Sequence, residues 1–274
     1  MPELPEVEHM TRLLSTWLGG ARVVAATAED PTVLDGPQSA LTGLTGAHLV
    51  RASRRAKLTV ATFSDGTTLV VSYRMTGKLV RADLPSPRRR RIRLRLAVAD
   101  RPEVWFDDTR RLGRVHVVRT SHLAEWLEER DLGPDPWPQR RTAAWWREHL
   151  GQSRRSIKPL LLDPSRVAGI GNIGASESLW RAGINPRARA CDLEADDWSA
   201  LAASVPAWIE RTLRNETKPE IDFVTQGGEN PFWIYGRRGG SCPRCGQPLE
   251  AFKQGGRTTF WCSACVTQGR RGEP

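Results

Sequence analysis

Four of the five cysteines stand in two pairs near the C-terminus, Cys242-x2-Cys245 and Cys262-x2-Cys265, with sixteen residues between the pairs. A Cys-x2-Cys turn can direct two thiolates at one ion, and two such turns supply the tetrahedral sulfur set that Zn²⁺ prefers. Two disulfides are the alternative, which a reducing compartment disfavours. Because four sulfur ligands leave no open coordination position, the pattern predicts one structural Zn²⁺ and not a catalytic ion.

A second reactive group stands at the N-terminus, in the sequence Met1-Pro2-Glu3-Leu4-Pro5-Glu6. A small second residue permits removal of Met1, which would leave Pro2 with a free secondary amine. An α-amino group titrates near ~8, against ~10.4 for lysine, so more of it is unprotonated at neutral pH. Such an amine can attack an aldehyde-like carbon to give an iminium ion, with Glu3 as general acid and Glu6 as an orienting group. The alternative is an ordinary helix start with acidic residues.

The charge of the chain indicates a polyanionic partner. Its 274 residues include 41 basic and 31 acidic side chains, a net charge of +10, and 36 of the basic residues are arginine. Arginine forks onto phosphate, so nucleic acid is the favoured partner class. No apolar run approaches the ~20 residues of a membrane span, and the N-terminus lacks the features of a targeting signal, so we expect a cytoplasmic protein.

Periodicity predicts the elements that must position these groups. Apolar residues at three- and four-residue spacing predict a helix over 5–17, and Val-, Leu- and Thr-rich runs predict strands over 58–63, 67–73, 92–98 and 114–119. Gly and Pro then mark a boundary near residue 132. Beyond it, the sequence predicts helices over 142–151, 157–162, 174–182 and 196–214.

Several motifs occur in one collinear order with the zinc pairs. They are the N-terminal string Met-Pro-Glu-Leu-Pro-Glu-Val-Glu, the segment Gly169-Ile-Gly-Asn-Ile-Gly-Ala-Ser-Glu-Ser-Leu, and the shorter pieces Arg54-Arg-Ala-Lys57, Met75-Thr-Gly77, Asp108-Thr-Arg-Arg-Leu-Gly113, Leu132-Gly-Pro-Asp-Pro136, Ile157-Lys-Pro159, Tyr235-Gly-Arg237 and Arg257-Thr-Thr-Phe-Trp-Cys262. From end to end, the chain resembles the Fpg/Nei family of bacterial formamidopyrimidine-DNA glycosylases. Each piece alone is weak, whereas their order is specific.

The resemblance implies an α+β fold. It comprises an N-terminal β-sandwich with a leading helix (1–131), a linker (132–141), a helix-two-turn-helix domain (142–235) and a four-cysteine zinc-finger β-hairpin (236–274). It also implies a bifunctional DNA glycosylase and AP lyase of base excision repair. Pro2 attacks C1′ of the flipped nucleotide, Glu3 protonates the sugar ring oxygen, and β,δ-elimination from the Schiff base leaves a one-nucleotide gap.

The resemblance further implies roles for individual residues. Lys57 serves in acid/base chemistry and phosphate binding, Asn172 holds the phosphate beside the lesion, and Lys158 and Arg257 bind further phosphates, with Arg257 also assisting elimination. Met75, Arg110 and Leu112 fill the hole that the flipped base leaves. The remaining DNA contacts are Arg91, Arg111 and Tyr235. Each role has a plain structural alternative. The charged residues could be ordinary surface charges, Asn172 could belong to an ordinary Gly-rich turn, and Met75 could be a core methionine.

Some positions depart from the family pattern. Leu112 stands where Phe is common, Thr109 replaces Pro, Gly174 replaces Tyr and Arg91 replaces a phosphate-binding His. The segment 224–234 is also shorter than expected for an enzyme that caps 8-oxoguanine.

These departures favour ring-opened purines, oxidised pyrimidines, abasic sites or bulky adducts over 8-oxoguanine. An AP lyase with little glycosylase activity and a non-catalytic zinc-ribbon DNA-binding protein stay as alternatives. We expect damaged duplex DNA as partner, a monomer, no membrane association and a bacterial, nucleoid-associated location.

Overall fold

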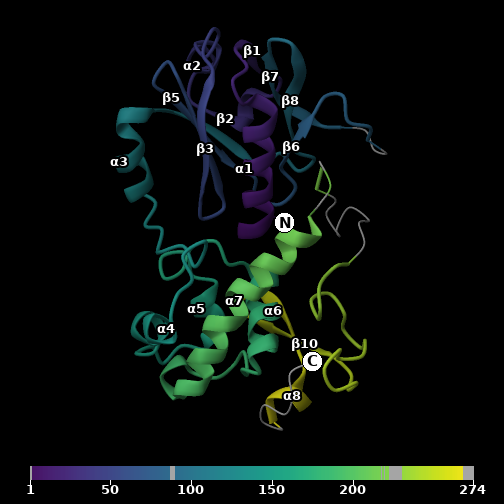
Figure 1. Ribbon diagram of the computed structural model, residues 1–274. Helices are drawn as coiled ribbons and strands as arrows, with labels where there is room; N and C mark the ends of the chain where they lie inside the picture. Colours follow the sequence, from purple (N-terminus) through teal and green to yellow (C-terminus); the bar gives the residue numbers. More distant parts are fainter. Residues whose placement is uncertain (1, 87–89, 217, 219, 222–229, 268–274) are drawn as a thin grey trace. The chain divides into compact units, whose positions relative to one another are not determined.

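The computed structural model describes residues 2–86, 90–216, 218, 220–221 and 230–267 (Figure 1). Met1 and most of the shortened segment after residue 221 therefore lie outside the described residues. The chain divides into two compact units, one of residues 1–131 and 216–228 and the other of residues 132–215 and 229–274. Within the described ranges, no helix is both long and apolar enough to cross a membrane.

The first unit is a β-sandwich, which confirms the predicted fold class for this half. Its four-stranded sheet has the order β1 (Val23–Ala28), β7 (Ile92–Val98), β8 (Arg101–Asp107) and β6 (Lys78–Arg81). Its five-stranded sheet has the order β2 (Leu34–Asp35), β9 (Arg114–Arg119), β5 (Thr67–Ser72), β4 (Leu58–Phe63) and β3 (Leu49–Arg55). All pairs are antiparallel except β2 with β9. Short helices α2 (Gln38–Thr42) and α3 (Leu123–Glu128) and two 3-10 turns complete the unit.

Alternating side chains explain the sandwich. In β7, Leu94, Leu96 and Val98 are buried while the intervening arginines are more exposed, as a half-buried strand requires. One core cluster contains these residues together with Phe63 and Leu69 of the other sheet. The two sheets therefore bury their apolar faces in one common core.

Helix α1 (Leu4–Leu18) packs against β3 and β4 of one sheet and β6 and β8 of the other (Figure 1). Its apolar face supplies Val7, Met10 and Leu14 to the core, at the three- and four-residue spacing that predicted the helix. The helix thus places the N-terminus of the chain on the sandwich.

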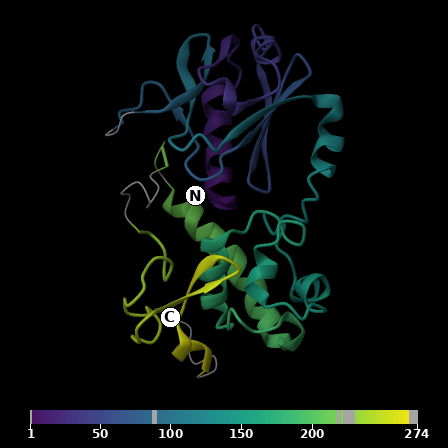
Figure 2. The same ribbon diagram turned by 180° about the vertical axis from the view of Figure 1, so that it is seen from behind.

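The second unit contains the helices α4 (Ala143–Leu150), α5 (Ile157–Leu161), α6 (Asn172–Ala182) and α7 (Ala195–Asn215), with a 3-10 turn over Ala190–Asp192. Helix α7 packs on α4 and α6, and α5 packs on α6. The hairpin of β10 (Glu250–Gln254) and β11 (Arg257–Trp261) follows and lies against α6, with α8 (Ser263–Thr267) after it (Figure 2). This order confirms the predicted helical domain and zinc-finger hairpin.

Candidate functional site

The start of α1 fixes the groups next to the N-terminus. Pro2 is buried, and Glu3 has an exposed fraction of 0% at the N-cap position. The backbone N–H of Glu3 donates to Oε2 of Glu6 over 2.8 Å, and the N–H of Val7 donates to the Glu3 carbonyl over 3.0 Å. The pairing of Glu3 with Glu6 is a capping box, which satisfies orphan donors at the start of the helix and fixes the backbone at Glu3, next to Pro2.

Glu6 stands in a strongly perturbed electrostatic environment. Burial, together with the negative charge of Glu3, raises the pKa of Glu6 to about 7. Glu216, on the segment that returns to this unit, adds a smaller contribution in the same direction. Burial and two neighbouring carboxylates therefore favour the protonated form of Glu6, close to the first residues of the chain.

Lys57 lies in the turn between β3 and β4, which is tied to the same helix. Nε of Arg54 contacts Oε2 of Glu8 over 3.2 Å, and the Arg54 guanidinium donates to the Ala56 carbonyl over 2.8 Å. The hydroxyl groups of Thr59 and Thr11 lie 2.7 Å apart, so the first residues of β4 also bind α1. The structure thus anchors the Lys57 turn to the helix that carries Glu3 and Glu6.

Asp108 organises the loops of the predicted wedge residues. Its side chain is fully buried and accepts hydrogen bonds from the Thr76 hydroxyl (2.5 Å) and from the N–H groups of Arg110 (3.2 Å) and Gly113 (2.7 Å). The turn after Met75 and the loop of residues 108–113 are therefore joined through one carboxylate. Sequence reasoning quoted Asp108 within a motif but gave it no role.

The predicted wedge residues and the neighbouring arginines differ in solvent exposure and in their intramolecular partners. Leu112 is 42% exposed, which is unusual for a large apolar residue in this chain, and Arg110 is also exposed. Met75 is half-buried. Nε of Arg111 pairs with Asp30 over 2.8 Å, which assigns that guanidinium an intramolecular partner. Arg91 is exposed, and its backbone N–H donates to the Asp107 carboxylate over 2.7 Å.

A second cluster of predicted residues forms within the other unit. Lys158 has an exposed fraction of 0%, and its Nζ donates to Oδ1 of Asn172 over 2.6 Å. The Asn172 amide nitrogen donates to the Thr258 carbonyl (2.9 Å) and to the Tyr235 hydroxyl (3.3 Å). Asn172 is the first residue of α6, where the helix dipole favours an anion. Arg257, at the start of β11, is exposed and adjacent to Thr258.

Glu177 is a site residue that sequence reasoning missed. Its carboxylate is fully buried and accepts three backbone N–H groups, those of Trp233 (2.7 Å), Ile234 (2.9 Å) and Tyr235 (2.9 Å). Burial raises the pKa of Glu177, although these hydrogen bonds favour its charged form. The one feature of the sequence that could have indicated a role for Glu177 is its position as an acidic residue among the small and apolar residues of a predicted helix.

Gly174 has a packing explanation. A Cβ atom at this position would come within 2.3 Å of the Trp208 indole ring. The glycine therefore lets α6 and α7 approach closely, and Trp208 takes the volume beside it. The departure at position 174 is thus linked to a large side chain on the neighbouring helix.

The four paired cysteines converge as predicted. Their sulfur atoms all lie within 4.8 Å of one another, with separations of 3.7 Å for Cys242 and Cys265 and 3.5 Å for Cys245 and Cys262. A tetrahedral site with Zn–S bonds of about 2.3 Å needs S···S distances of roughly 3.8 Å. The sulfur set therefore fits one structural Zn²⁺, and the disulfide alternative is wrong, because all four are free thiols.

Comparisons with known proteins agree with this geometry. Residues 1–115 match the formamidopyrimidine-DNA glycosylase N-terminal domain, residues 132–221 its H2TH domain, and residues 239–268 the zinc finger found in FPG and IleRS.

Relatives of full length support the same assignment. The formamidopyrimidine-DNA glycosylase of Desulforamulus reducens is 32% identical over 273 residues, covering 97% of this chain and 99% of that protein. The enzyme of Moorella thermoacetica is 35% identical over 257 residues, covering 91% and 94%. A crystal structure of Lactococcus lactis Fpg (MutM) with DNA containing an oxidised pyrimidine superimposes with a TM-score of 0.85 at 29% identity, over 96% of this chain and 99% of that one. The chain therefore belongs to the formamidopyrimidine-DNA glycosylase family.

Proposed function

We propose that Pro2 is the nucleophile of this bifunctional DNA glycosylase and AP lyase, which acts in base excision repair. The buried capping box of Glu3 and Glu6 is the observation that carries the proposal, because it places two buried carboxyl groups next to the secondary amine of Pro2, and the pKa of Glu6 is raised to about 7. An amine in this setting suits covalent catalysis on a sugar carbon. A plain helix start would not require two buried glutamates.

The proposed chemistry proceeds through one covalent intermediate. The Pro2 nitrogen attacks C1′, the damaged base leaves, and the Glu3 carboxyl donates its proton to the ring oxygen, which opens the sugar and gives an iminium ion. Loss of a C2′ proton then breaks the C3′–O bond, and a second elimination breaks the C5′–O bond. Hydrolysis of the iminium releases the sugar fragment and regenerates the amine.

We assign the remaining residues to proton transfer and to DNA binding. Lys57 carries a proton or contacts a phosphate, and Lys158, Asn172, Tyr235 and Arg257 hold the phosphates near the lesion. The hydrogen bonds from Lys158 to Asn172 and from Asn172 to Tyr235 support a shared anion site. The further proposed DNA contacts are Met75, Arg91, Arg110, Arg111 and Leu112.

The proposed substrate is damaged duplex DNA, bound by a monomeric chain with a linker over 132–141. The exposed aliphatic Leu112 supports a wedge that stacks less strongly than an aromatic ring. We therefore propose ring-opened purines, oxidised pyrimidines and abasic sites as better substrates than 8-oxoguanine. Lactococcus lactis Fpg has been crystallised with N7-benzyl-Fapy-dG DNA, so a related chain accommodates a bulky ring-opened purine.

Borohydride trapping on a panel of duplexes tests this function. Untagged protein is incubated with duplexes that carry an abasic site, a ring-opened purine, an oxidised pyrimidine or 8-oxoguanine, and the trapped fraction is measured. A matched protein with a two-residue N-terminal extension moves the amine away from Glu3 and serves as control. We expect adducts only with the free N-terminus. The trapped fraction should fall from the abasic site through the ring-opened purine and the oxidised pyrimidine to 8-oxoguanine.

The alternatives predict other outcomes. An AP lyase without glycosylase activity traps the abasic duplex alone. A non-catalytic zinc-ribbon protein binds every duplex and traps none, which would refute the catalytic proposal.

A further inference from the structure

Helix α6 contacts the zinc centre through Trp180, near its C-terminal end. The indole Nε1–H of Trp180 donates to Sγ of Cys242 over 3.4 Å, and the two residues are 5% and 2% exposed. An N–H···S bond of this length lies within the range for a sulfur acceptor. A buried indole N–H normally finds such a partner, and here the partner is a zinc ligand.

The surroundings of Trp180 strengthen this contact. Sγ of Cys242 also lies 3.7 Å from Sγ of Cys265, so Trp180 is a donor from outside the four-cysteine set. The Arg244 guanidinium lies over the Trp180 ring with its Cζ 4.9 Å from the ring centroid, and its Nη2 donates to the Arg181 carbonyl over 2.8 Å. The first Cys-x2-Cys turn is therefore fastened to the last turns of α6.

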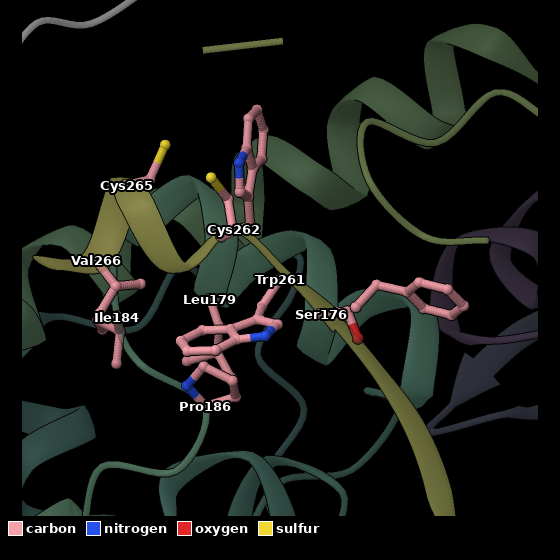
Figure 3. Close-up of a pocket in the computed structure, with 10 residues that line it drawn as sticks. Ser176, Leu179, Ile184, Pro186, Trp261, Cys262, Cys265 and Val266 are labelled. Atoms are coloured by element: carbon pink, nitrogen blue, oxygen red, sulfur yellow. The ribbon is translucent and has the colours of Figure 1, made fainter. Parts of the chain in front are cut away.

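The rest of α6 contacts the same module. Figure 3 shows Leu179 of α6 beside Trp261 and Pro186, while the sulfur atoms of Cys262 and Cys265 point away from these residues. At the first residue of the helix, Asn172 donates to the Thr258 carbonyl of β11. An eleven-residue helix thus holds the zinc module at both of its ends.

We propose that Trp180 is a positioning residue of the zinc centre, whose indole N–H stabilises the Cys242 thiolate and slows loss of the metal. Through α6, the same contact links the zinc centre to the anion site at Asn172. A thiolate that accepts a charge-assisted hydrogen bond is a weaker nucleophile and exchanges less readily, and partners outside the ligand set commonly tune a metal in this way. The inference depends on the zinc site and not on the role proposed for Pro2.

A direct test uses the unsubstituted chain loaded with ¹¹³Cd²⁺. If the indole N–H of Trp180 donates to a metal-bound sulfur, its ¹H resonance shows scalar coupling to ¹¹³Cd across the hydrogen bond. A Trp180 indole resonance without such coupling, in a protein whose Cd²⁺ is bound by four sulfurs, would overturn the proposal. This measurement needs no variant to fold.

A pair of matched variants tests the consequence. Trp180→Phe keeps an aromatic ring and removes the donor, whereas Trp233→Phe changes a neighbouring ring of the same cluster, 5.6 Å from that of Trp180, that donates no hydrogen bond to sulfur among the described residues. We expect Trp180→Phe to lose Zn²⁺ to a chromogenic chelator roughly tenfold faster, the equivalent of one lost hydrogen bond to a charged group. The sulfur-to-metal charge-transfer band of its Co²⁺ form should move to lower energy.

The control separates hydrogen bonding from packing. Trp233→Phe should match the unsubstituted chain in both the release rate and the Co²⁺ band. Equal acceleration in the two variants, with the Co²⁺ band unmoved in both, would mean that packing alone matters and would refute the role of the Trp180 N–H.

Discussion

Replacing Glu177 with Gln should detach the segment that carries Tyr235. The Glu177 carboxylate accepts the N–H groups of Trp233, Ile234 and Tyr235, and two of these bonds share Oε1. A glutamine can keep its oxygen at the Oε1 position, but its NH₂ group then faces the Trp233 N–H, donor against donor. Each hydrogen bond to a charged group contributes about 1.5–3 kcal/mol, and neutral bonds about half of that.

The expected cost follows from these values. One charge-assisted bond is lost and two become neutral, which we estimate at about 3–6 kcal/mol for the docking of residues 233–235. Relief from burying a charge, seen in the raised pKa of Glu177, offsets part of this cost in global stability. The local effect should therefore exceed the change in the free energy of unfolding.

Amide hydrogen exchange measures the local effect. We expect exchange at Trp233, Ile234 and Tyr235 to accelerate by a factor of roughly 10² to 10⁴, and affinity for a duplex with an abasic-site analogue to fall. The control is Glu148→Gln, at an exposed glutamate of α4 in the same unit. Unchanged exchange of the three amides in Glu177→Gln would refute the proposed anchoring.

Three further predictions concern other parts of the chain. Because folding raises the pKa of Glu6 to about 7, the folded state binds more protons than the unfolded state, and the free energy of unfolding falls as pH rises toward 7. In Glu6→Gln, the decrease in the free energy of unfolding between pH 5 and pH 8, measured by urea titration, should be smaller by about 2–3 kcal/mol. Gly174→Ala should lower the free energy of unfolding by about 1–3 kcal/mol through its clash with Trp208, and Trp208→Leu should relieve most of that cost in a double-mutant cycle of thermal melts. Removal of Zn²⁺ by a chelator should unfold the hairpin of β10 and β11 and weaken DNA binding, and re-added Zn²⁺ should restore both; binding that survives complete metal removal would contradict a structural role for the ion.

The sequence predicted the elements with strong periodicity. The helix expected over 5–17 is α1, and the runs expected at 58–63, 92–98 and 114–119 are strands with those bounds. Strands β3 and β8 were missed because their sequences, Leu-Val-Arg-Ala-Ser-Arg-Arg and Arg-Pro-Glu-Val-Trp-Phe-Asp, mix charged residues with few apolar ones. Pairing with neighbouring strands fixes them despite this composition.

The site could be predicted only where its residues lie close together in the sequence. The four cysteines and the N-terminal glutamates are close in sequence, so their spacing carries the information. Glu177, in contrast, binds amides 56 to 58 residues further along the chain, and the partner of Arg111 is Asp30. Such contacts depend on tertiary structure, and no local pattern indicates them.

The central claim is that the Pro2 nitrogen forms the bond to deoxyribose. The most direct measurement is peptide mapping of the borohydride-reduced adduct on an abasic duplex by mass spectrometry. We predict that the sugar remnant is attached to the N-terminal nitrogen of the tryptic peptide that covers residues 2–12. A remnant on Lys57, or on any other side chain, would contradict the account.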